Sequence, residues 1–238
     1  MNAANDTAPE PLVLAETRDG VCTLTLNRGD RFNPLSRAMI AAFETELDRL
    51  AADKDARAVV LAANGRGFCA GHDLKELRAH PDVAWQRELF DACSRMMLKL
   101  TQLPQPVIAR VHGIATAAGC QLVAACDLAV ASSEAKFATS GINFGLFCAT
   151  PGVPVSRNVS RKRAFEMLFT GEFIDAETAR AWGLVNRVVP PAEQLDEEIA
   201  RLVARIAEKP RAVVAAGKAF FYRQLEAPLA QAYRLAAA

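Results

Sequence analysis

Three short apolar runs, separated by longer segments with helical periodicity, constrain the fold of this chain more than any other feature. The runs are "RAVVLAAN", "PVIARVHG" and "LAVAS". A continuous apolar strand is typical of a parallel sheet that is covered on both faces. Because strand, loop, helix and strand repeat along the chain, the pattern predicts right-handed βαβ crossovers and therefore an α/β fold with a parallel sheet.

The segments around these runs complete the expected order of elements. Asp19-Gly20 predicts a hairpin turn between two strands, and Ser36 is a typical N-cap for the helix that follows. A further helix is expected from about Asp82 to Leu103, before Pro104. We therefore expect a disordered N-terminus over residues 1–10 and a sheet core with the ligand site over residues 11–150.

The last third of the chain has a mainly helical sequence pattern. "SRKRAFEMLFTG" predicts a helix that ends at Gly171, and Asp175 can cap the helix in "DAETARAWGLV". Two longer helical segments follow, "PAEQLDEEIARLVARIAEKP" and "PRAVVAAGKAFFYRQLEA". Residues 151–238 are therefore expected to form a helical region with a role in oligomerisation.

Composition excludes several classes of function. A net charge of +1 over 238 residues gives no reason to expect nucleic acid or an anionic membrane as a partner. The six cysteines show no metal-binding spacing, so we expect no metal and a reducing compartment. No signal peptide or membrane-spanning run is predicted, which favours the cytoplasm or an organelle matrix.

Two loops share a design that indicates a binding site. "FCAGHDL" and "ATAAGC" each follow a buried strand and lead into a helix. Backbone N–H groups at the carboxyl ends of neighbouring parallel strands can converge on one point and form an oxyanion hole. The alternative is that both loops are ordinary tight turns, and spacing alone does not decide between the two.

Longer motifs resemble one known family. "FCAGHDLKEL", "GIATAAGCQLVAACDLAVAS" and "KFATSGINFGLFCATPGV" look like the enoyl-CoA hydratase/isomerase, or crotonase, superfamily, with most similarity to its enoyl-CoA hydratase domain-containing protein 3 branch. The resemblance implies a spiral of ββα units and a helical C-terminal region that makes homotrimers or hexamers built as dimers of trimers. It also implies an acyl-CoA thioester as ligand, with coenzyme A as part of the substrate and no separate cofactor. A further helix after "AYRLAAA" is usual in this family.

The resemblance assigns roles to particular residues. It places the two oxyanion-hole N–H groups on His72 and Ala118, although the family usually has glycine at the second position. Ala117 belongs to the same loop. Arg28 and Arg31 occupy a loop that reaches the CoA phosphates in relatives, and the alternative for each is a solvated surface charge. The segment expected along CoA comprises Ala70, Gly71, His72, Asp73, Leu74 and Lys75, with Lys75 as a phosphate ligand.

Both glutamates that activate water in the hydratases of this family are replaced. Their positions correspond to Gln121 and Gly141. Glutamine can hold a water molecule but cannot accept a proton near neutral pH, and glycine has no side chain that could do either. Ser140 is the polar residue beside the second position. Hydratase chemistry is therefore expected to be lost or altered, and replacing both residues by glutamate is expected to raise hydration.

Other chemistry-bearing side chains are better explained by structure. A structural hydrogen bond is the favoured role for His112, and Asp127 is expected to end the helix that begins near Ala118. Cys69 and Cys120 flank the two loops but lack an evident base, which disfavours a thiol nucleophile.

Three functions stay open at this point. The first is an enzyme that acts on acyl-CoA: a hydratase, an isomerase, or a catalyst of decarboxylation or thioester cleavage. The second is a non-catalytic acyl-CoA binder. The third is a serine peptidase of the related Clp-protease spiral fold, which the sequence disfavours because no serine lies in a recognisable nucleophile turn.

Overall fold

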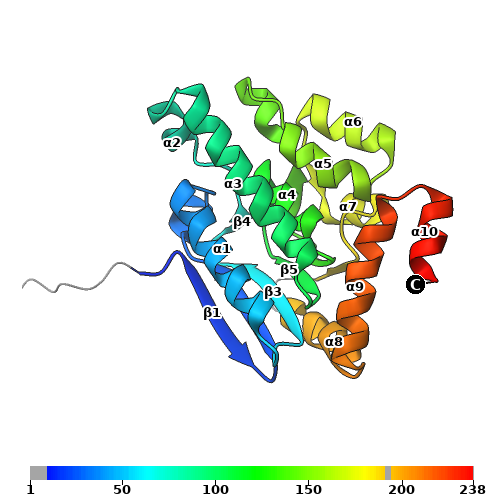
Figure 1. Ribbon diagram of the computed structural model, residues 1–238. Helices are drawn as coiled ribbons and strands as arrows, with labels where there is room; N and C mark the ends of the chain where they lie inside the picture. The colour runs from blue at the N-terminus through cyan, green and yellow to red at the C-terminus, as the bar shows by residue number, and fades with distance from the viewer. Residues whose placement is uncertain (1–9, 191–193, 238) are drawn as a thin grey trace, which may run out of the picture.

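A six-stranded sheet forms the centre of the molecule (Figure 1). The computed structural model describes residues 10–190 and 194–237, so the disorder expected at the N-terminus concerns residues that lie outside the described part, apart from Glu10. The strand order is β1-β2-β3-β5-β7-β10. The β1–β2 hairpin is antiparallel and the remaining pairs are parallel, as predicted. The strands are β1 Val13–Arg18, β2 Val21–Leu26, β3 Ala58–Ala63, β5 Val107–Val111, β7 Leu128–Ser132 and β10 Arg187–Val189.

A second sheet of very short strands accompanies the first. Its order is β4-β6-β8-β9, with β4 Gly67–Cys69, β6 Ile114–Thr116, β8 Lys136–Ala138 and β9 Ile174–Asp175. Each of β4, β6 and β8 follows a strand of the larger sheet and precedes helical structure. The chain therefore repeats a ββα unit, which confirms the spiral that the family resemblance implied.

The helices begin and end largely where their capping residues predict. Ser36 Oγ accepts from Met39 N at 3.1 Å, and Asp175 Oδ1 accepts from Thr178 N at 2.7 Å. Gly171 ends its helix with φ +64°. The helices are α1 Arg37–Ala52, α2 Leu74–Ala79, α3 Val83–Gln102, α4 Ala118–Ala125, α5 Ala149–Asn158, α6 Arg161–Thr170, α7 Ala176–Trp182, α8 Leu195–Ala207, α9 Arg211–Leu225 and α10 Leu229–Ala236, with 3₁₀ turns η1 Gly29–Arg31 and η2 Ser140–Phe144.

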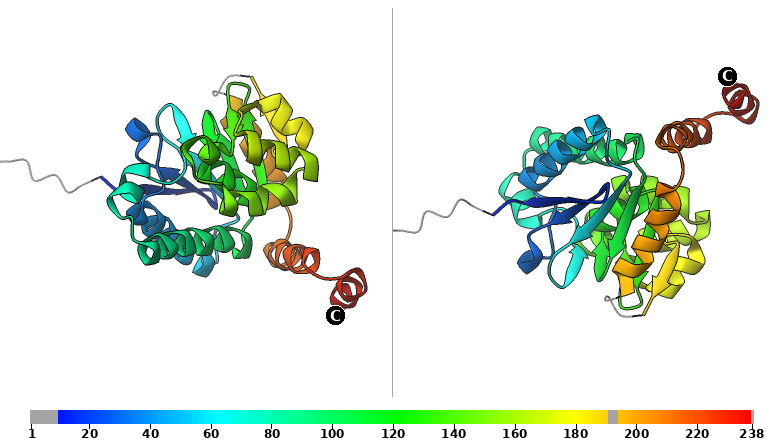
Figure 2. Two further views of the ribbon diagram at one scale, coloured as in Figure 1. Left: turned by 90° about the horizontal axis from the view of Figure 1, so that it is seen from above. Right: turned by 90° about the horizontal axis from the view of Figure 1, so that it is seen from below.

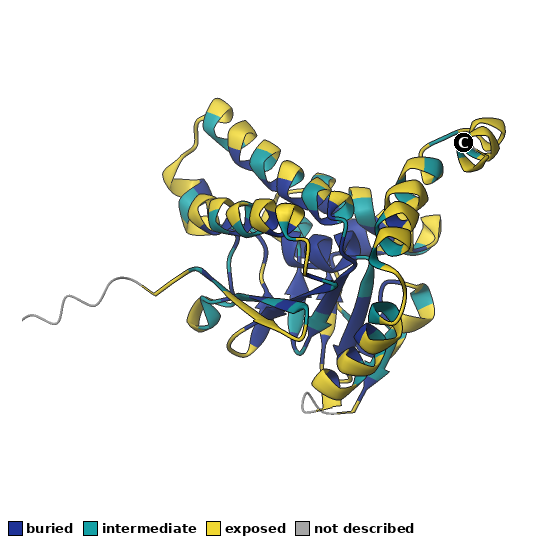
Figure 3. Ribbon diagram, turned by 60° about the horizontal axis from the view of Figure 1, so that its bottom comes forward, coloured by how far each residue is buried: buried dark blue, intermediate teal, exposed yellow. Residues whose placement is uncertain are grey.

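The larger sheet is covered on both faces, which explains its continuous apolar strands. Val59 and Leu61 of β3 face the main core, to which α1 and α3 contribute. Val60 faces the opposite way and packs in a second cluster with Ile199 and Val203 of α8. Figure 3 shows the buried strands between these more exposed helices. No helix among the described residues combines the length and apolar character needed to cross a lipid bilayer.

Helices α9 and α10 form a C-terminal arm, residues 211–236, that extends away from the rest of the molecule (Figure 2). Lys218 is the one buried residue of α9, a helix that the structure describes in full. Its Nζ donates to Asp127 Oδ2 at 2.6 Å and to the carbonyl oxygens of Leu100 and Gln105. The arm is therefore held to the body by a buried charge pair.

Asp127 is a connector of three elements. Besides Lys218, its carboxylate accepts from Val107 N at 2.6 Å, at the start of β5, and from the Tyr222 hydroxyl at 2.7 Å. Asp127 follows the end of α4, as predicted, and the contacts show that its role is to join α4, β5 and α9. The network borders an open groove of about 510 Å³ between α8 and α9.

Candidate active site

The N-terminus of α4 is buried and has no side-chain cap. Ala118, Gly119 and Cys120 are fully buried, and Ala117 at the N-cap position has no polar side chain. Helices α1, α2, α3 and α7 are capped by Ser36, Asp73, Asp82 and Asp175 instead. Buried backbone N–H groups without an acceptor are rare in folded proteins, and they are costly to maintain. The start of α4, which is both uncapped and buried, is therefore a place where a ligand oxygen would be favoured.

The first loop meets this helix end at close range. Gly71 has φ +93°, and a Cβ built on it would lie 2.9 Å from Ala117 Cβ and 3.1 Å from Ala118 N. His72 follows directly. Neither His72 N nor Ala118 N donates to a backbone acceptor within the described ranges. The two N–H groups assigned from the sequence thus lie in neighbouring segments and both lack a backbone acceptor.

A close contact between Gly119, the residue after Ala118, and the Cys69 carbonyl holds the start of α4 against the first loop. A Cβ on Gly119 would lie 2.0 Å from Cys69 O, a distance that no real side chain could adopt. The first turn of α4 therefore packs directly on the last residue of β4. Only glycine permits this contact, because any side chain would push the helix away from the strand.

Strain at this site falls on Ala117 and not on Ala118. Ala117 has φ +50° and ψ −120°, a region that favours glycine, whereas Ala118 is the first residue of the helix. Ala117 N donates to Ala138 O at 3.0 Å, and Ala117 O accepts from Gln121 N at 3.1 Å. A non-glycine residue in such a conformation costs on the order of 1–3 kcal/mol. The hydrogen bonds on both sides hold it there and orient the Ala118 N–H.

Gln121 lies one turn beyond Ala118 and is almost completely buried, at 3% exposure. Its Oε1 atom is buried and has no protein donor. A buried polar atom without a partner is the second observation that indicates a ligand in this part of the molecule. The amide is uncharged, so it can orient a ligand or a water molecule but cannot take a proton from one.

The position of the second family glutamate is crowded. A Cβ on Gly141 would lie 2.4 Å from Leu146 O and 2.8 Å from Cys148 Sγ. Leu146 N also donates to Gly141 O, which closes the segment on itself. The Leu146 backbone fills the space that a glutamate side chain at position 141 would need, so in the double change to glutamate we expect position 121 alone to contribute to hydration.

Ser140 belongs to a buried hydroxyl pair. Its Oγ lies 2.7 Å from Thr116 Oγ1, which links η2 to the end of β6 next to the Ala117 loop. Thr116 was not singled out in the sequence, because a threonine at a strand end carries no distinctive signal. The pair lies beside the candidate site. Ser140 Oγ bonds to Thr116 and not to a histidine that could act as a base.

The basic residues proposed for the CoA phosphates differ in availability. The Arg28 guanidinium donates to backbone carbonyls, including Glu10 O at 2.7 Å and Pro11 O at 3.2 Å. Arg31 is exposed and lies 3.6 Å from Asp30. Lys75 is exposed on the first turn of α2 and forms no ion pair with the described residues. Of the three, Lys75 is thus the cation best placed to meet an anionic ligand.

The rest of the first loop has structural contacts. Asp73 Oδ1 accepts from Lys75 N at 2.9 Å and from Glu76 N at 3.2 Å, so Asp73 caps α2. Ala70 N donates to Phe32 O, and Leu74 is 40% exposed. These contacts fix the course of the loop that leads away from His72.

Asn33 was missed by the sequence reasoning and holds the early loop in place. It is fully buried, accepts from Arg28 N at 2.8 Å and donates to Asn64 O, Gly67 O and Phe68 O. The Asn-Pro pair at residues 33–34 was an available signal, since it marks a turn. The side chain thereby connects the loop that contains Arg28 and Arg31 to β4.

The remaining candidates have structural explanations. His112 Nε2 lies 2.8 Å from Gly65 O, the structural hydrogen bond that was expected. Burial raises the pKa values of Cys69 and Cys120 to about 12, so neither thiol is a thiolate at neutral pH. Among residues 10–190 and 194–237, no group of three His, Cys, Asp or Glu side chains is arranged to bind a metal ion.

The contact between Gly119 and Cys69 gives a direct test of the site's architecture. We expect Gly119→Ala to lower the free energy of unfolding by several kcal/mol, because the new methyl group overlaps the Cys69 carbonyl. The matched control is Gly217→Ala, where a Cβ meets nothing within 4 Å. In helix α9 this control should be neutral or stabilising by up to about 1 kcal/mol. Equal effects in chemical denaturation would contradict the packing described.

The His72 side chain predicts a pH dependence. Its Nε2 is buried without a protein partner, and burial lowers its pKa from 6.5 to about 4. The unfolded chain therefore binds a proton here below about pH 6.5 while the folded chain does not, so stability falls as the pH decreases toward 4. The loss is about 3 kcal/mol. In urea titrations across this window, His72→Asn should lose less stability than the wild type, and identical slopes would refute the assignment.

The chain is similar to known proteins over most of its length. The family model described as enoyl-CoA hydratase/isomerase matches residues 16–238. Enoyl-CoA hydratase domain-containing protein 3, mitochondrial, of Rattus norvegicus is 46% identical over 94% of this chain and 75% of its own length. The crystal structure of the human protein of that name is 45% identical, with a TM-score of 0.91 over 95% of this chain and 89% of that one. An enoyl-CoA hydratase from Mycobacterium smegmatis is 60% identical, with a TM-score of 0.94 over 96% and 89% of the two chains. This chain therefore belongs to the enoyl-CoA hydratase/isomerase family.

Proposed function

We propose that this protein binds an acyl-CoA thioester and stabilises negative charge on the thioester oxygen through the backbone N–H groups of His72 and Ala118. The observation that carries the proposal is the buried, uncapped N-terminus of α4, which lies against the loop that contains His72. Donors of this kind bind an enolate or a tetrahedral oxyanion more strongly than the neutral carbonyl, and they need no side chain.

The electrostatics of the site suit this role. The partial positive charge at the start of α4 adds to the two N–H groups, in a buried environment where water screens little. His72 stays neutral at pH 7 because burial lowers the pKa of its ring. The stabilisation of an anionic thioester oxygen therefore rests on backbone dipoles.

Proton transfer distinguishes the possible reactions. Hydration of an enoyl thioester by two carboxylates is not supported, since Gln121 is an amide and Gly141 is enclosed by Leu146 and Cys148. Isomerisation, decarboxylation and thioester cleavage also begin with a polarised thioester carbonyl. A non-catalytic acyl-CoA binder is the second candidate, and the missing acids favour it. A serine peptidase is disfavoured because Ser140 pairs with Thr116.

Access to the site involves movement. Ala118 is fully buried, so a thioester oxygen reaches its N–H only after a neighbouring segment shifts. The η2 segment contacts Thr116, the residue before Ala117, through Ser140. It ends at Phe144, which is 68% exposed, and Phe147 beyond it is 45% exposed. We therefore assign the opening to η2 and the residues that follow it. Lys75 is proposed to meet a CoA phosphate at the outer end of the first loop, in a reducing compartment such as the cytoplasm or an organelle matrix.

Removal of one backbone donor tests the oxyanion hole. Ala118→Pro deletes an N–H at the first position of α4, where proline is tolerated in helices. We expect this variant to lose about 2.7–4 kcal/mol of transition-state stabilisation with any thioester that the protein turns over. If there is no turnover, calorimetry should show weaker binding of an acyl-CoA.

The control for this experiment is Ala176→Pro, the same change at the first position of α7. It should leave acyl-CoA binding and turnover unchanged. Circular dichroism and a melting curve confirm that both variants are folded. A folded Ala118→Pro protein with unaltered binding and turnover would show that this N–H does not contact the ligand.

Gln121 determines the expected hydratase activity. The native protein should hydrate crotonyl-CoA weakly or not at all, since each positioned acid–base group contributes about 10²–10⁴-fold. Gln121→Glu should raise hydration within that range, because the new carboxylate lies one turn from Ala118. Gly141→Glu, alone or combined with it, should fail to add activity and should destabilise the fold. Native turnover equal to that of a two-glutamate hydratase would overturn this interpretation.

We propose a homotrimer as the functional assembly, with pairing of two trimers into a hexamer as an extension. The arm carries large apolar side chains that the rest of its own chain does not cover, with exposures of 58% for Leu225, 75% for Leu229 and 71% for Tyr233. Exposed apolar surface of this kind marks an interaction site. Sedimentation velocity at micromolar concentration should give a trimer or hexamer, and a monomer would refute the assembly.

A further inference from the structure

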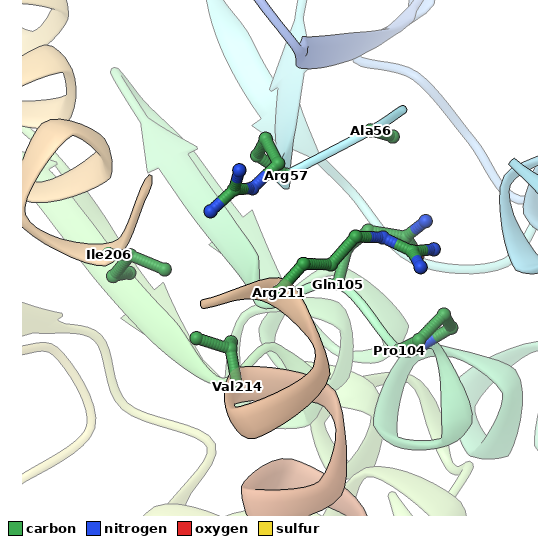
Figure 4. A pocket seen from close by; sticks show the side chains of 7 residues that line it. All are labelled: Ala56, Arg57, Pro104, Gln105, Ile206, Arg211 and Val214. Atoms are coloured by element: carbon green, nitrogen blue, oxygen red, sulfur yellow. The ribbon is translucent and has the colours of Figure 1, made fainter. Parts of the chain in front are cut away.

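A small cavity of about 10 Å³ lies where the C-terminal arm joins the body (Figure 4). Arg211, the first residue of α9, lines it together with Gln105 and Arg57. These side chains come from three separate parts of the chain: the start of the arm, the segment before β5 and the segment before β3. The cavity is separate from the candidate active site.

Gln105 presents an acceptor to this cavity. The residue is 2% exposed, and its Nε2 donates to Leu50 O at 2.8 Å and to Asp53 O at 3.1 Å. Because two carbonyl oxygens require a donor, these bonds fix the orientation of the amide group. The amide oxygen of Gln105, Oε1, consequently faces away from these two carbonyls, and it is buried without a protein donor.

Arg211 presents a donor to the same cavity. Its Nη2 donates to Asp53 O at 2.8 Å, while its Nε is buried without a protein acceptor. Arg57 is engaged elsewhere, since its Nη2 donates to Ala207 O and Lys209 O. One buried acceptor and one buried donor thus line one cavity, and they do not bond to each other.

We propose that one internal water molecule occupies this cavity and bridges Arg211 Nε to Gln105 Oε1. The occupant must accept from an N–H and donate to an amide oxygen at once. A halide ion can only accept, and a phosphate ion is too large for a volume of about 10 Å³. A water molecule has both functions, and a volume of this size admits about one.

The position of this water gives it a structural role in the arm. Leu50 and Asp53 lie at the end of α1, and Gln105 lies before β5. Ala207 is the last residue of α8, and Lys209 lies between α8 and α9. The bridge therefore completes a polar cluster that joins the root of the arm to the body. The buried Lys218–Asp127 pair holds the same helix two turns further along. The direction of α9, and with it the placement of α10, depends on both anchors.

A crystal structure of the full chain, at a resolution that shows ordered water, tests the occupant. We expect a single peak within hydrogen-bond distance of Arg211 Nε and Gln105 Oε1, and no anomalous signal there after exchange into bromide. An anomalous bromide peak would identify an anion site and overturn the proposal. A cavity with no peak in a well-ordered region would overturn it as well.

A double-mutant cycle tests the bridge in solution. Arg211→Lys removes the Nε donor and keeps the charge, and Gln105→Met removes the Oε1 acceptor together with the Nε2 bonds to Leu50 O and Asp53 O. Because either change breaks the same bridge, the double variant should lose less stability than the sum of the single losses. The departure from additivity should be roughly 2- to 10-fold in the unfolding equilibrium constant.

The control cycle pairs Gln105→Met with Arg223→Lys. Arg223 is an exposed residue of the same helix and does not line the cavity. Its effect should add to that of Gln105→Met. Additive behaviour in the Arg211 cycle as well would show that no bridge connects the two side chains.

Discussion

The contact of Gly119 with the Cys69 carbonyl is the constraint on which the candidate site depends. It brings the first turn of α4 against the end of β4, so the loop after β4 and the start of the helix share one boundary. The N-cap residue is Ala117, which has no polar side chain, and the N–H groups at the start of α4 therefore lack a side-chain cap. Ala117 completes the arrangement in a strained conformation held by Ala138 and Gln121. The packing that stabilises the spiral thus also leaves free the N–H groups that we propose as the oxyanion hole.

This origin means that the free N–H groups at the start of α4 do not depend on acidic side chains nearby. Backbone N–H groups depend on how the chain packs, so substitution of side chains around them leaves them in place. The groups that move protons are side chains, and they can be lost independently. At Gln121 the charge is lost while the shape and the buried polar atom are kept. At position 141 there is no side chain, and the Leu146 carbonyl and the Cys148 thiol occupy the space around the glycine. Of these two positions, only Gln121 presents a buried polar side-chain atom near the start of α4.

Much of the fold could be predicted because its signals are local. The apolar runs of β3, β5 and β7, the Asp19-Gly20 turn and the caps Ser36 and Asp175 each act within a few residues. The short strands β4, β6 and β8 were harder, since three residues show no periodicity and their pairing is set by the larger sheet. Asn33, the crowding at Gly141 and the burial of Lys218 could not be predicted from pattern. Each depends on atoms far along the chain: Lys218 bonds to Asp127, 91 residues away.

The arm shows how these long-range contacts bear on function. A helix whose one buried side chain is a charged lysine gains little from apolar burial within its own chain. Its attachment is instead directional, because hydrogen bonds from Lys218, Tyr222 and Arg211 are satisfied at one orientation of the helix. Apolar contacts alone would permit the helix to slide, since they have no preferred direction. Polar anchors therefore fix where the apolar face of the arm points before any partner covers it. Apolar packing therefore stabilises the core of this chain, whereas buried polar contacts set the orientation of the arm and of its exposed apolar face.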